Sequence, residues 1–473
     1  MAGPETGKPE PRDEERPPVE AVDEEELYGP SEKLLENVSA ALAEGDIPQV
    51  EELIEDLHPA DVADLIEHLE PDERKLFVEI TRHVIEPETI SHLDETVREE
   101  VVEQLGPQAV AEVVSGLDTD DAVELLEDLA PDQQERVLQS VPAEDRVLLQ
   151  QSLTFPEDSA GRLMQRELVA IPAHWTVGGT IDFLRSNKDL PDDFYDLYVV
   201  DETHKPAGSV PLSRVLRSPR PTRLADIMET ELRLVAADTD QEAVAYLFRQ
   251  YALVSAPVVD KAGRLIGVVT VDDVVRVIDE EAEEDLMKIV GASDTDFHAP
   301  PHIIAWRRVR WLIVTLINTM IAATVISQFQ DTIQHTVALA VLMPIVAAMG
   351  GNAGVQVITV TVRALATRDI TPQSNMLRII GKELIVGLLN ALVFAAILGV
   401  LATWWFGHPQ LGLVLAGAMI FNMVWAGMAG TLIPLIMDRL GFDPAIGAGP
   451  FLTTTTDVLG FFSFLGLATL FLV

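Results

Sequence analysis

The sequence contains no cysteine and has few basic residues. Without cysteine, the chain cannot form disulfides, zinc-cysteinate sites, iron–sulfur clusters or thiol nucleophiles. Its 473 residues include 33 Lys and Arg against 76 Asp and Glu, a formal net charge of −43 at pH 7. So few cations cannot neutralise a phosphate backbone, which excludes a nucleic-acid binder of the usual basic kind. No Walker-type phosphate loop is present and no covalent catalysis is indicated, so we do not expect an enzyme.

Charge and hydropathy lie in different halves of the chain. Although 48% of all residues are hydrophobic, residues 311–473 hold only five basic and six acidic side chains, which leaves 28 basic and 70 acidic ones in residues 1–310. Five stretches of the apolar half come close to or exceed the ~20 residues that a membrane-crossing helix needs. They span roughly residues 311–326, 337–362, 384–406, 411–437 and 445–473.

The positions of Lys and Arg predict how these stretches are oriented. Basic residues precede the first stretch and lie between the second and third and between the fourth and fifth, whereas the other two connections have none. Because loops rich in Lys and Arg stay in the cytoplasm, the amino-terminal half is predicted inside and the carboxyl terminus outside. We therefore expect a multi-pass protein of the cell inner (plasma) membrane with cytoplasmic amino-terminal domains.

The acidic half begins with a predicted disordered tail, residues 1–30, which is rich in Pro and Glu and poor in aliphatic residues. Residues 31–155 then repeat a pattern in which an apolar residue is followed by a helix-opening Pro or Thr and by acids that suit a first helical turn. The apolar residues, mostly at 12-residue steps, are Leu57, Leu69, Leu93, Leu105, Leu117, Leu129 and Val141. One short helix per repeat cannot bury its apolar stripe alone, so we expect an acidic α-superhelical solenoid.

Residues 160–276 contain two copies of a β-α-β-β-α pattern, about 160–220 and 221–276. Their strand pairs are offset by 59 residues, as from Val200 to Val259, and their first strands are predicted at 163–164 and 227–228. This pattern resembles a tandem pair of CBS domains, a regulatory module that often binds adenine nucleotides. Pro206 and Pro211 depart from it around the first hairpin. ATP binding at the pair therefore stays open, and no cofactor-binding residue is assigned.

The second apolar stretch contains Pro344 and a glycine-rich segment that ends in Asn352 and Gln356. Proline removes a helix hydrogen bond, and the glycines permit a neighbouring backbone to approach closely. Asn352 and Gln356 are one turn apart, so their two amides share one helix face. They line a pore or, alternatively, bond to neighbouring helices across a kink.

The fifth stretch contains four threonines, Thr453 to Thr456, followed by Asp457. Asp457 is predicted near the middle of the bilayer, where a carboxylate costs about 2.5–3.5 kcal/mol on insertion scales. It should face a cavity, a partner or an ion, and no basic residue lies deep in any stretch. The alternative is a protonated Asp457 bonded to the Thr hydroxyls. A cation site explains the carboxylate better.

Taken together, these features resemble the MgtE family of magnesium channels over residues 31–473. The resemblance implies a solenoid, a tandem CBS pair, a connecting or "plug" helix at 277–300 and a five-helix transmembrane domain at 301–473. It also implies a homodimer with a pore on its axis, in which Asp457 of each subunit holds a hydrated Mg²⁺. Asn352 matches a pore asparagine, and Gln356, Thr453 and Thr456 complete the predicted set. Small residues that suit close helix contacts support a dimer: Gly417, Gly427, Gly430 and Gly460.

The dense acidic run at residues 279–285 is either a solvated face or part of a sensor for cytosolic Mg²⁺. The resemblance implies such a sensor, in which Mg²⁺ bridges repelling carboxylates and closes the pore. Its predicted ligands are Asp272, Glu280, Glu283, Glu284 and Asp443, with Asp120 and Glu124 from the solenoid. The predicted function is a Mg²⁺-selective channel for inward transport driven by membrane potential and closed by cytosolic Mg²⁺. The alternative is a proton- or sodium-coupled transporter that uses Asp457 as the carrier carboxylate.

Overall fold

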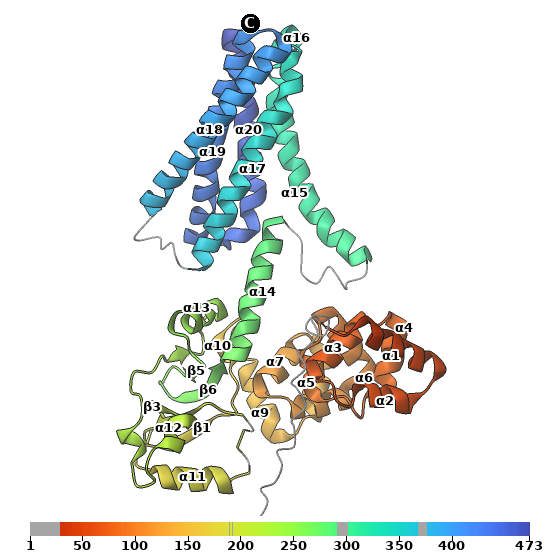
Figure 1. The fold of residues 1–473 in the computed structure, drawn as a ribbon, viewed down its shortest axis with the longest axis vertical. Coiled ribbons are helices and arrows are strands. Elements are labelled where there is room, and N and C mark those ends of the chain that lie inside the picture. The colour runs from red at the N-terminus through yellow and green to blue at the C-terminus, as the bar shows by residue number, and fades with distance from the viewer. Residues whose placement is uncertain (1–28, 189, 192, 291–300, 368–375) are drawn as a thin grey trace, which may run out of the picture. The chain divides into compact units, whose positions relative to one another are not determined.

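A computed structural model describes residues 29–188, 190–191, 193–290, 301–367 and 376–473 (Figure 1). The predicted disordered tail lies almost wholly outside the described residues. The chain divides into two compact units, one with residues up to 117 and 125–143, the other with 118–124 and 144–473. Each unit is built from elements that the sequence pattern largely predicts.

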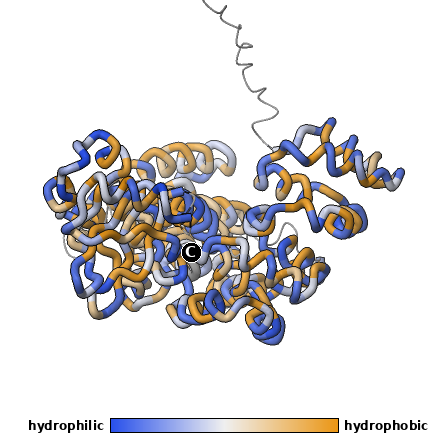
Figure 2. Tube along the Cα trace, turned by 90° about the horizontal axis from the view of Figure 1, so that it is seen from below, coloured by the Kyte–Doolittle hydropathy of each residue, from blue (hydrophilic) through white to orange (hydrophobic). Residues whose placement is uncertain are grey.

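Short helices make up the first unit and the start of the second. They are α1 Glu32–Glu44, α2 Ile47–Ile54, α3 Pro59–His68, α4 Pro71–Thr81, α5 Pro87–Ser91, α6 Glu95–Gly116, α7 Thr119–Glu127, α8 Pro131–Ser140 and α9 Ala143–Ser152. Most begin at multiples of the 12-residue step, with Pro or an acid in the first turn. Hydrophilic and hydrophobic residues alternate along these short helices (Figure 2), as each helix needs in order to bury one face.

The repeat also explains a break inside α6. Gly106 has φ 75° and ψ 165°, outside the helical region, and Pro107 follows it. A helix therefore ends before Gly106 and a new one begins at Pro107, at the predicted step. In the first part of α6, the side chain of Arg98 is only 7% exposed and lies 2.6 Å from the carboxylate of Asp128. Such a buried ion pair is strongly destabilising to break, since the remaining charge has no partner.

The CBS region folds as two three-stranded sheets, each with the predicted β-α-β-β-α order. The first copy contains β1 Val169–Pro172, α11 Val177–Ser186, β2 Asp196–Val200, β3 Pro206–Pro211 and α12 Leu212–Arg217. The second contains β4 Val235–Ala236, α13 Gln241–Tyr251, β5 Ser255–Val259, β6 Leu265–Thr270 and α14 Val271–Val290. In each sheet the first two strands run parallel and the last two antiparallel.

The predicted first strands at 163–164 and 227–228 are wrong. Leu163 ends the short helix α10, Ala160–Leu163, and a 3₁₀ turn, η2 Leu224–Asp226, precedes Ile227. Each entry segment instead makes a single bridge to the opposite copy, Gln165 to Val268 and Ser209 to Glu229. The pattern of apolar residues could not distinguish this crossing from a strand in the copy's own sheet.

The last CBS helix and the predicted connecting helix form one continuous helix. α14 begins at Val271, directly after β6, and is described as far as Val290. Residues 291–300 of the predicted connecting helix lie outside the described residues. The acidic run at 279–285 therefore lies in the middle of a 20-residue helix that starts in the CBS core.

Among the described residues, five helices are long and apolar enough to cross a membrane. The transmembrane region consists of α15 Pro301–Ser327, the short α16 Gln330–His335, α17 Ala338–Ala366, α18 Met376–Phe406, α19 Pro409–Arg439 and α20 Pro444–Phe471. α19 is the most enclosed of the five, and α17, α18 and α20 pack against it.

Glycines allow α17, α19 and α20 to approach closely. A Cβ on Gly354 of α17 would lie 2.6 Å from the Cδ2 atom of Leu452 in α20, and one on Gly430 of α19 would lie 2.9 Å from the carbonyl oxygen of Gly354. Gly460 similarly faces Asn422 inside the bundle. The close helix contacts expected at Gly430 and Gly460 thus form within one protomer, so these glycines are not arguments for a dimer interface.

Candidate functional site

Asp457 lies in the middle of α20 and is half-buried in the protomer. Among the described residues, no side chain makes a hydrogen bond or an ion pair with its carboxylate. Thr453, one turn earlier on the same helix, is exposed on the protomer surface. The carboxylate and this hydroxyl therefore lie one helical turn apart at the edge of the bundle, where an ion or a partner could reach both.

The threonine hydroxyls before Asp457 are bonded to their own helix. Thr453 donates to the carbonyl oxygen of Gly449 at 3.0 Å, and Thr456 donates to that of Leu452 at the same distance. These bonds use the hydroxyl protons and leave the oxygens as acceptors. Thr456 is fully buried, so it lies inside the bundle and away from the exposed face. The structure does not bring the hydroxyls to Asp457 as the protonated alternative requires.

Asn352 and Gln356 lie exposed on α17. Among the described residues, neither amide has a hydrogen-bond partner, so the alternative in which they bond to neighbouring helices is not what the structure shows. Gln356 borders a cavity of about 180 Å³ between α17, α18 and α19, together with the polar side chains of Glu383 and Asn390. Polar groups that lie within a bilayer need water, an ion or a protein partner, because hydrocarbon offers no hydrogen bonds.

Sequence reasoning missed Asn422 of α19. It is fully buried, and its Nδ2 atom donates to the carbonyl oxygen of Val346 at 2.9 Å, whereas its Oδ1 atom is buried without a partner. Gly350 of α17 and Gly460 of α20 make room for it. The sequence feature that could have identified Asn422 is a single amide within a long apolar stretch. Asn422 joins the three central helices of the bundle.

A cluster of carboxylates surrounds Arg276 where α7 meets α14 within the second unit. Nη1 of Arg276 lies 3.2 Å from Asp121, and Nη2 lies 3.3 Å from Glu124 and 3.4 Å from Asp273. Asp120, buried beside Asp273, has an Oδ1 atom without a hydrogen-bond partner. Burial and the nearby charge of Asp273 hold the pKa of Asp120 well above its usual range.

The predicted ligand Asp272 is turned away from this cluster and lies nearer the surface, whereas its neighbour Asp273 is buried in it. Burial raises the pKa of Asp273 to about 6, against a lowering effect of the hydrogen bond that Thr270 donates. The turn of about 100° between successive helix residues therefore places Asp273, and not Asp272, beside Asp120 and Arg276.

A second junction joins the end of α14 to the start of α20. Lys288 pairs with Glu284 and lies 2.8 Å from the carboxylate of Asp443. Asp443 also caps α20 by accepting a hydrogen bond from the backbone N–H of Ala445 at 2.7 Å. Burial, followed by the charge of Asp443, raises the pKa of Asp285 to about 6. The structure thus brings together two predicted ligands, Glu284 and Asp443, with a lysine between them.

The other predicted ligands on α14, Glu280 and Glu283, are exposed. Within the described part of the chain, no three His, Cys, Asp or Glu side chains are grouped so that they could hold a metal ion. A regulatory ion would therefore need backbone or water oxygens, or ligands from a second chain, in addition to these carboxylates.

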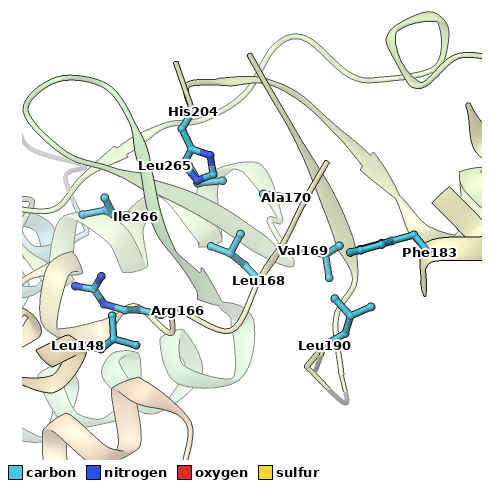
Figure 3. A pocket seen from close by; sticks show the side chains of 10 residues that line it. All are labelled: Leu148, Arg166, Leu168, Val169, Ala170, Phe183, Leu190, His204, Leu265 and Ile266. Atoms are coloured by element: carbon cyan, nitrogen blue, oxygen red, sulfur yellow. The ribbon is translucent and has the colours of Figure 1, made fainter. Parts of the chain in front are cut away.

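The CBS pair contains a cleft with a cavity of about 440 Å³ (Figure 3). Its walls are mainly apolar, from β1, β6 and α11, and its polar side chains are Arg166 and His204. Arg166 and His204 lie toward one side of the cleft, and Phe183 and Leu190 toward the other (Figure 3). Burial lowers the pKa of Arg166. The cleft can hold a flat apolar group with an anionic group beside it.

Comparisons with known proteins show which family the chain belongs to. A model for divalent cation transporters matches residues 343–467, one for the MgtE intracellular N domain matches 57–158, and one for CBS domains matches 224–280. The magnesium transporter MgtE of Thermus thermophilus is 37% identical over 321 residues, which are 67% of this chain and 71% of that protein. MgtE of Bacillus subtilis is 34% identical over 327 residues, 68% and 72% of the two chains.

The chain belongs to the MgtE family of magnesium transporters. As an MgtE protein it is a membrane transporter rather than an enzyme, its transported ion is Mg²⁺, and its amino-terminal domain is cytosolic. The expected fold class is confirmed: a helical cytosolic domain, CBS domains and five candidate membrane helices.

Two solved structures resemble the cytosolic half. The cytosolic domain of the Mg²⁺ channel MgtE in complex with ATP is 32% identical and has a TM-score of 0.48, covering 51% of this chain and 99% of that one. The soluble part of a magnesium transporter is 26% identical and has a TM-score of 0.47, covering 53% and 99%.

Proposed function

We propose that this MgtE protein is a Mg²⁺-selective channel for passive inward transport. The observation that carries the proposal is Asp457, a carboxylate in a membrane helix without a protein counter-charge among the described residues. Such a group is costly in a bilayer unless an ion or water reaches it. The alternative, a proton- or sodium-coupled transporter, would use the same carboxylate but require a coupling ion.

The chemistry of Mg²⁺ suits an open site of this kind. Mg²⁺ prefers octahedral oxygen ligands and gives up its water slowly. A wide site that binds the hydrated ion therefore suits it better than a narrow site that must remove the water. Asp457 from two chains supplies two negative charges, and Thr453, Asn352 and Gln356 present oxygens on exposed faces. Membrane potential supplies about 2.3 kcal/mol per charge per 100 mV, or about 4.6 kcal/mol for Mg²⁺.

Replacing Asp457 by Asn tests the ion site. Asp457→Asn keeps the size of the side chain and removes its charge, so Mg²⁺ flux into proteoliposomes should fall at least about tenfold while the protein folds normally. Asp457→Glu should be intermediate, because the added methylene shifts the carboxylate. The matched control is Asp331→Asn, an exposed acid on α16, which should conduct like the wild type. Wild-type flux through Asp457→Asn would show that Asp457 is not the ion site.

We propose that the channel is a homodimer in the cell inner (plasma) membrane, with its carboxyl terminus outside. The orientation follows from the basic loops. The dimer rests on the exposed amides of Asn352 and Gln356 and on the half-buried Asp457, which are polar groups at membrane depth that one protomer leaves uncovered. A second copy that faces them would enclose a polar pathway.

The mass of the purified protein in mild detergent tests this assembly. Native mass spectrometry or light scattering should give two 51.8 kDa chains per particle, and the same preparation should transport Mg²⁺. A monomer that transports Mg²⁺ in liposomes at one chain per vesicle would contradict the dimer.

We also propose that cytosolic Mg²⁺ closes the channel by binding acidic residues on and beside α14. Glu280 and Glu283 are exposed on this helix, while Glu284 and Asp443 lie at its junction with α20, and Asp272 lies at its start, outside the Arg276 cluster. Carboxylates that face each other repel unless a divalent ion binds between them. Salt screens the repulsion between solvated carboxylates at separations beyond about 8 Å. Bridging at contact distance should therefore dominate at physiological Mg²⁺.

Three substitutions on α14 test the sensor. Glu280→Gln, Glu283→Gln and Glu284→Gln together should leave a channel that conducts but no longer closes at several millimolar internal Mg²⁺, measured as open probability in excised patches. The matched control carries the same charge change on exposed acids of α1, Glu32, Glu36 and Glu44, and should close normally. If both triple variants close like the wild type, the acidic run is only a solvated face.

For the CBS cleft we propose ATP as the ligand, because its apolar walls suit a purine ring and Arg166 suits a phosphate. Arg166→Gln should weaken ATP binding about tenfold in calorimetric titration of the full chain, whereas Arg185→Gln, an exposed arginine on α11, should not. Equal ATP affinity of both variants and the wild type would rule out this cleft as the site.

A further inference from the structure

The contact between α7 and α14 is already closed by a cation that belongs to the chain. Arg276 extends from α14 and reaches α7, where Nη1 approaches Asp121 and Nη2 approaches Glu124, while Nη2 also approaches Asp273 of its own helix. The guanidinium therefore stands between the acids of the two helices. Its side chain is 30% exposed, so it is largely removed from water.

The charges at this contact show how strongly the arginine is held. Burial alone would lower the pKa of Arg276, but the charges of Glu124, Asp121 and Asp273 outweigh it and raise the pKa instead. A planar guanidinium with several donors in a fixed fork suits three carboxylates spread around it. The site is thus already built for a guanidinium.

The same arrangement fits Mg²⁺ poorly. Mg²⁺ needs oxygens at about 2.0–2.1 Å in octahedral geometry, whereas the three acids are placed 3.2–3.4 Å from the nitrogens of a group that is several ångströms wide. An ion entering between them would have to displace a fixed positive charge. Glu124 is already paired, and Asp120 is turned into the buried side of the cluster.

We propose that Arg276 takes the place of a regulatory divalent cation at the α7–α14 contact, so that this contact stays closed whether or not Mg²⁺ is present. This proposal rests on the proposed Mg²⁺ gating in one respect. It excludes Asp120 and Glu124 as ligands of the Mg²⁺ sensor. Control by Mg²⁺ is then confined to α14 and its junction with α20.

Thr119 provides a second attachment of α7 that also requires no metal ion, in agreement with the proposal. Its backbone N–H and its hydroxyl both donate to the carboxylate of Glu167, at 3.2 Å and 2.6 Å. The start of α7 is therefore tied to the segment before β1 by hydrogen bonds, and its first two turns are tied to α14 by Arg276. Both attachments are made by side chains of the chain itself.

Hydrogen exchange of the α7 amides in the full-length protein tests the proposal. In the wild type, exchange of α7 should be the same in a chelator and in several millimolar Mg²⁺. In Arg276→Gln, exchange in the chelator should rise about tenfold or more, because the acids then repel without a counter-charge. Mg²⁺ should restore protection to this variant, since divalent ions can now join the carboxylates.

Two controls complete the experiment. Arg264→Gln removes an exposed arginine that pairs with Asp260 in the CBS hairpin and should leave α7 unchanged. Arg276→Lys keeps the charge but loses the fork, so its α7 exchange in the chelator should fall between those of the wild type and Arg276→Gln.

A wild-type α7 that becomes protected only when Mg²⁺ is added would overturn the proposal, and so would an Arg276→Gln variant that exchanges like the wild type in the chelator. Failure of the gating scheme would look different. Wild-type flux would then be insensitive to internal Mg²⁺, whatever the exchange of α7.

Discussion

Carboxylates outnumber cationic side chains in this protein by 76 to 33, so every acid that folding removes from water has to find a counter-charge, a proton or a metal ion. The structure shows the first solution repeatedly. Arg98 neutralises Asp128 in the helical unit, Arg276 neutralises the acids at the α7–α14 contact, and Lys288 joins Glu284 to Asp443. Asp457 has no such protein partner among the described residues, and the proposed function makes the transported ion its counter-charge.

The geometry of α14 connects the acidic half to the proposed ion site at Asp457. This helix leaves the CBS core after β6, and its end packs against the start of α20, where a Cβ on Gly449 would lie 2.7 Å from the carbonyl oxygen of Ile289. Asp457 follows eight residues later on α20, about 12 Å along the helix axis. A displacement of α14 would therefore act on the helix that carries the proposed pore carboxylate, with no intervening loop to absorb it.

Much of the fold could be predicted because residues close together in the sequence determine it. The 12-residue step predicts where most short helices begin, including the break at Gly106, since Pro and acids in a first turn carry that information residue by residue. The five membrane helices follow from apolar length alone.

The first CBS strands were misplaced because Gln165 and Glu229 pair with the opposite copy. Arg276 and Asn422 were missed for a related reason: Arg276 meets Asp121 across 155 residues and Asn422 meets Val346 across 76, and no local pattern records such pairs.

The most direct test of the account is the reversal potential of the current through the purified protein, with a Mg²⁺ gradient as the only ion gradient and equal pH on both sides. A passive Mg²⁺ channel should reverse at the Mg²⁺ equilibrium potential, which moves about 30 mV for each tenfold change in the gradient because the ion carries two charges. A current that flows only when a proton or sodium gradient is added, or a reversal potential that follows pH instead of Mg²⁺, would contradict the channel and favour a coupled transporter.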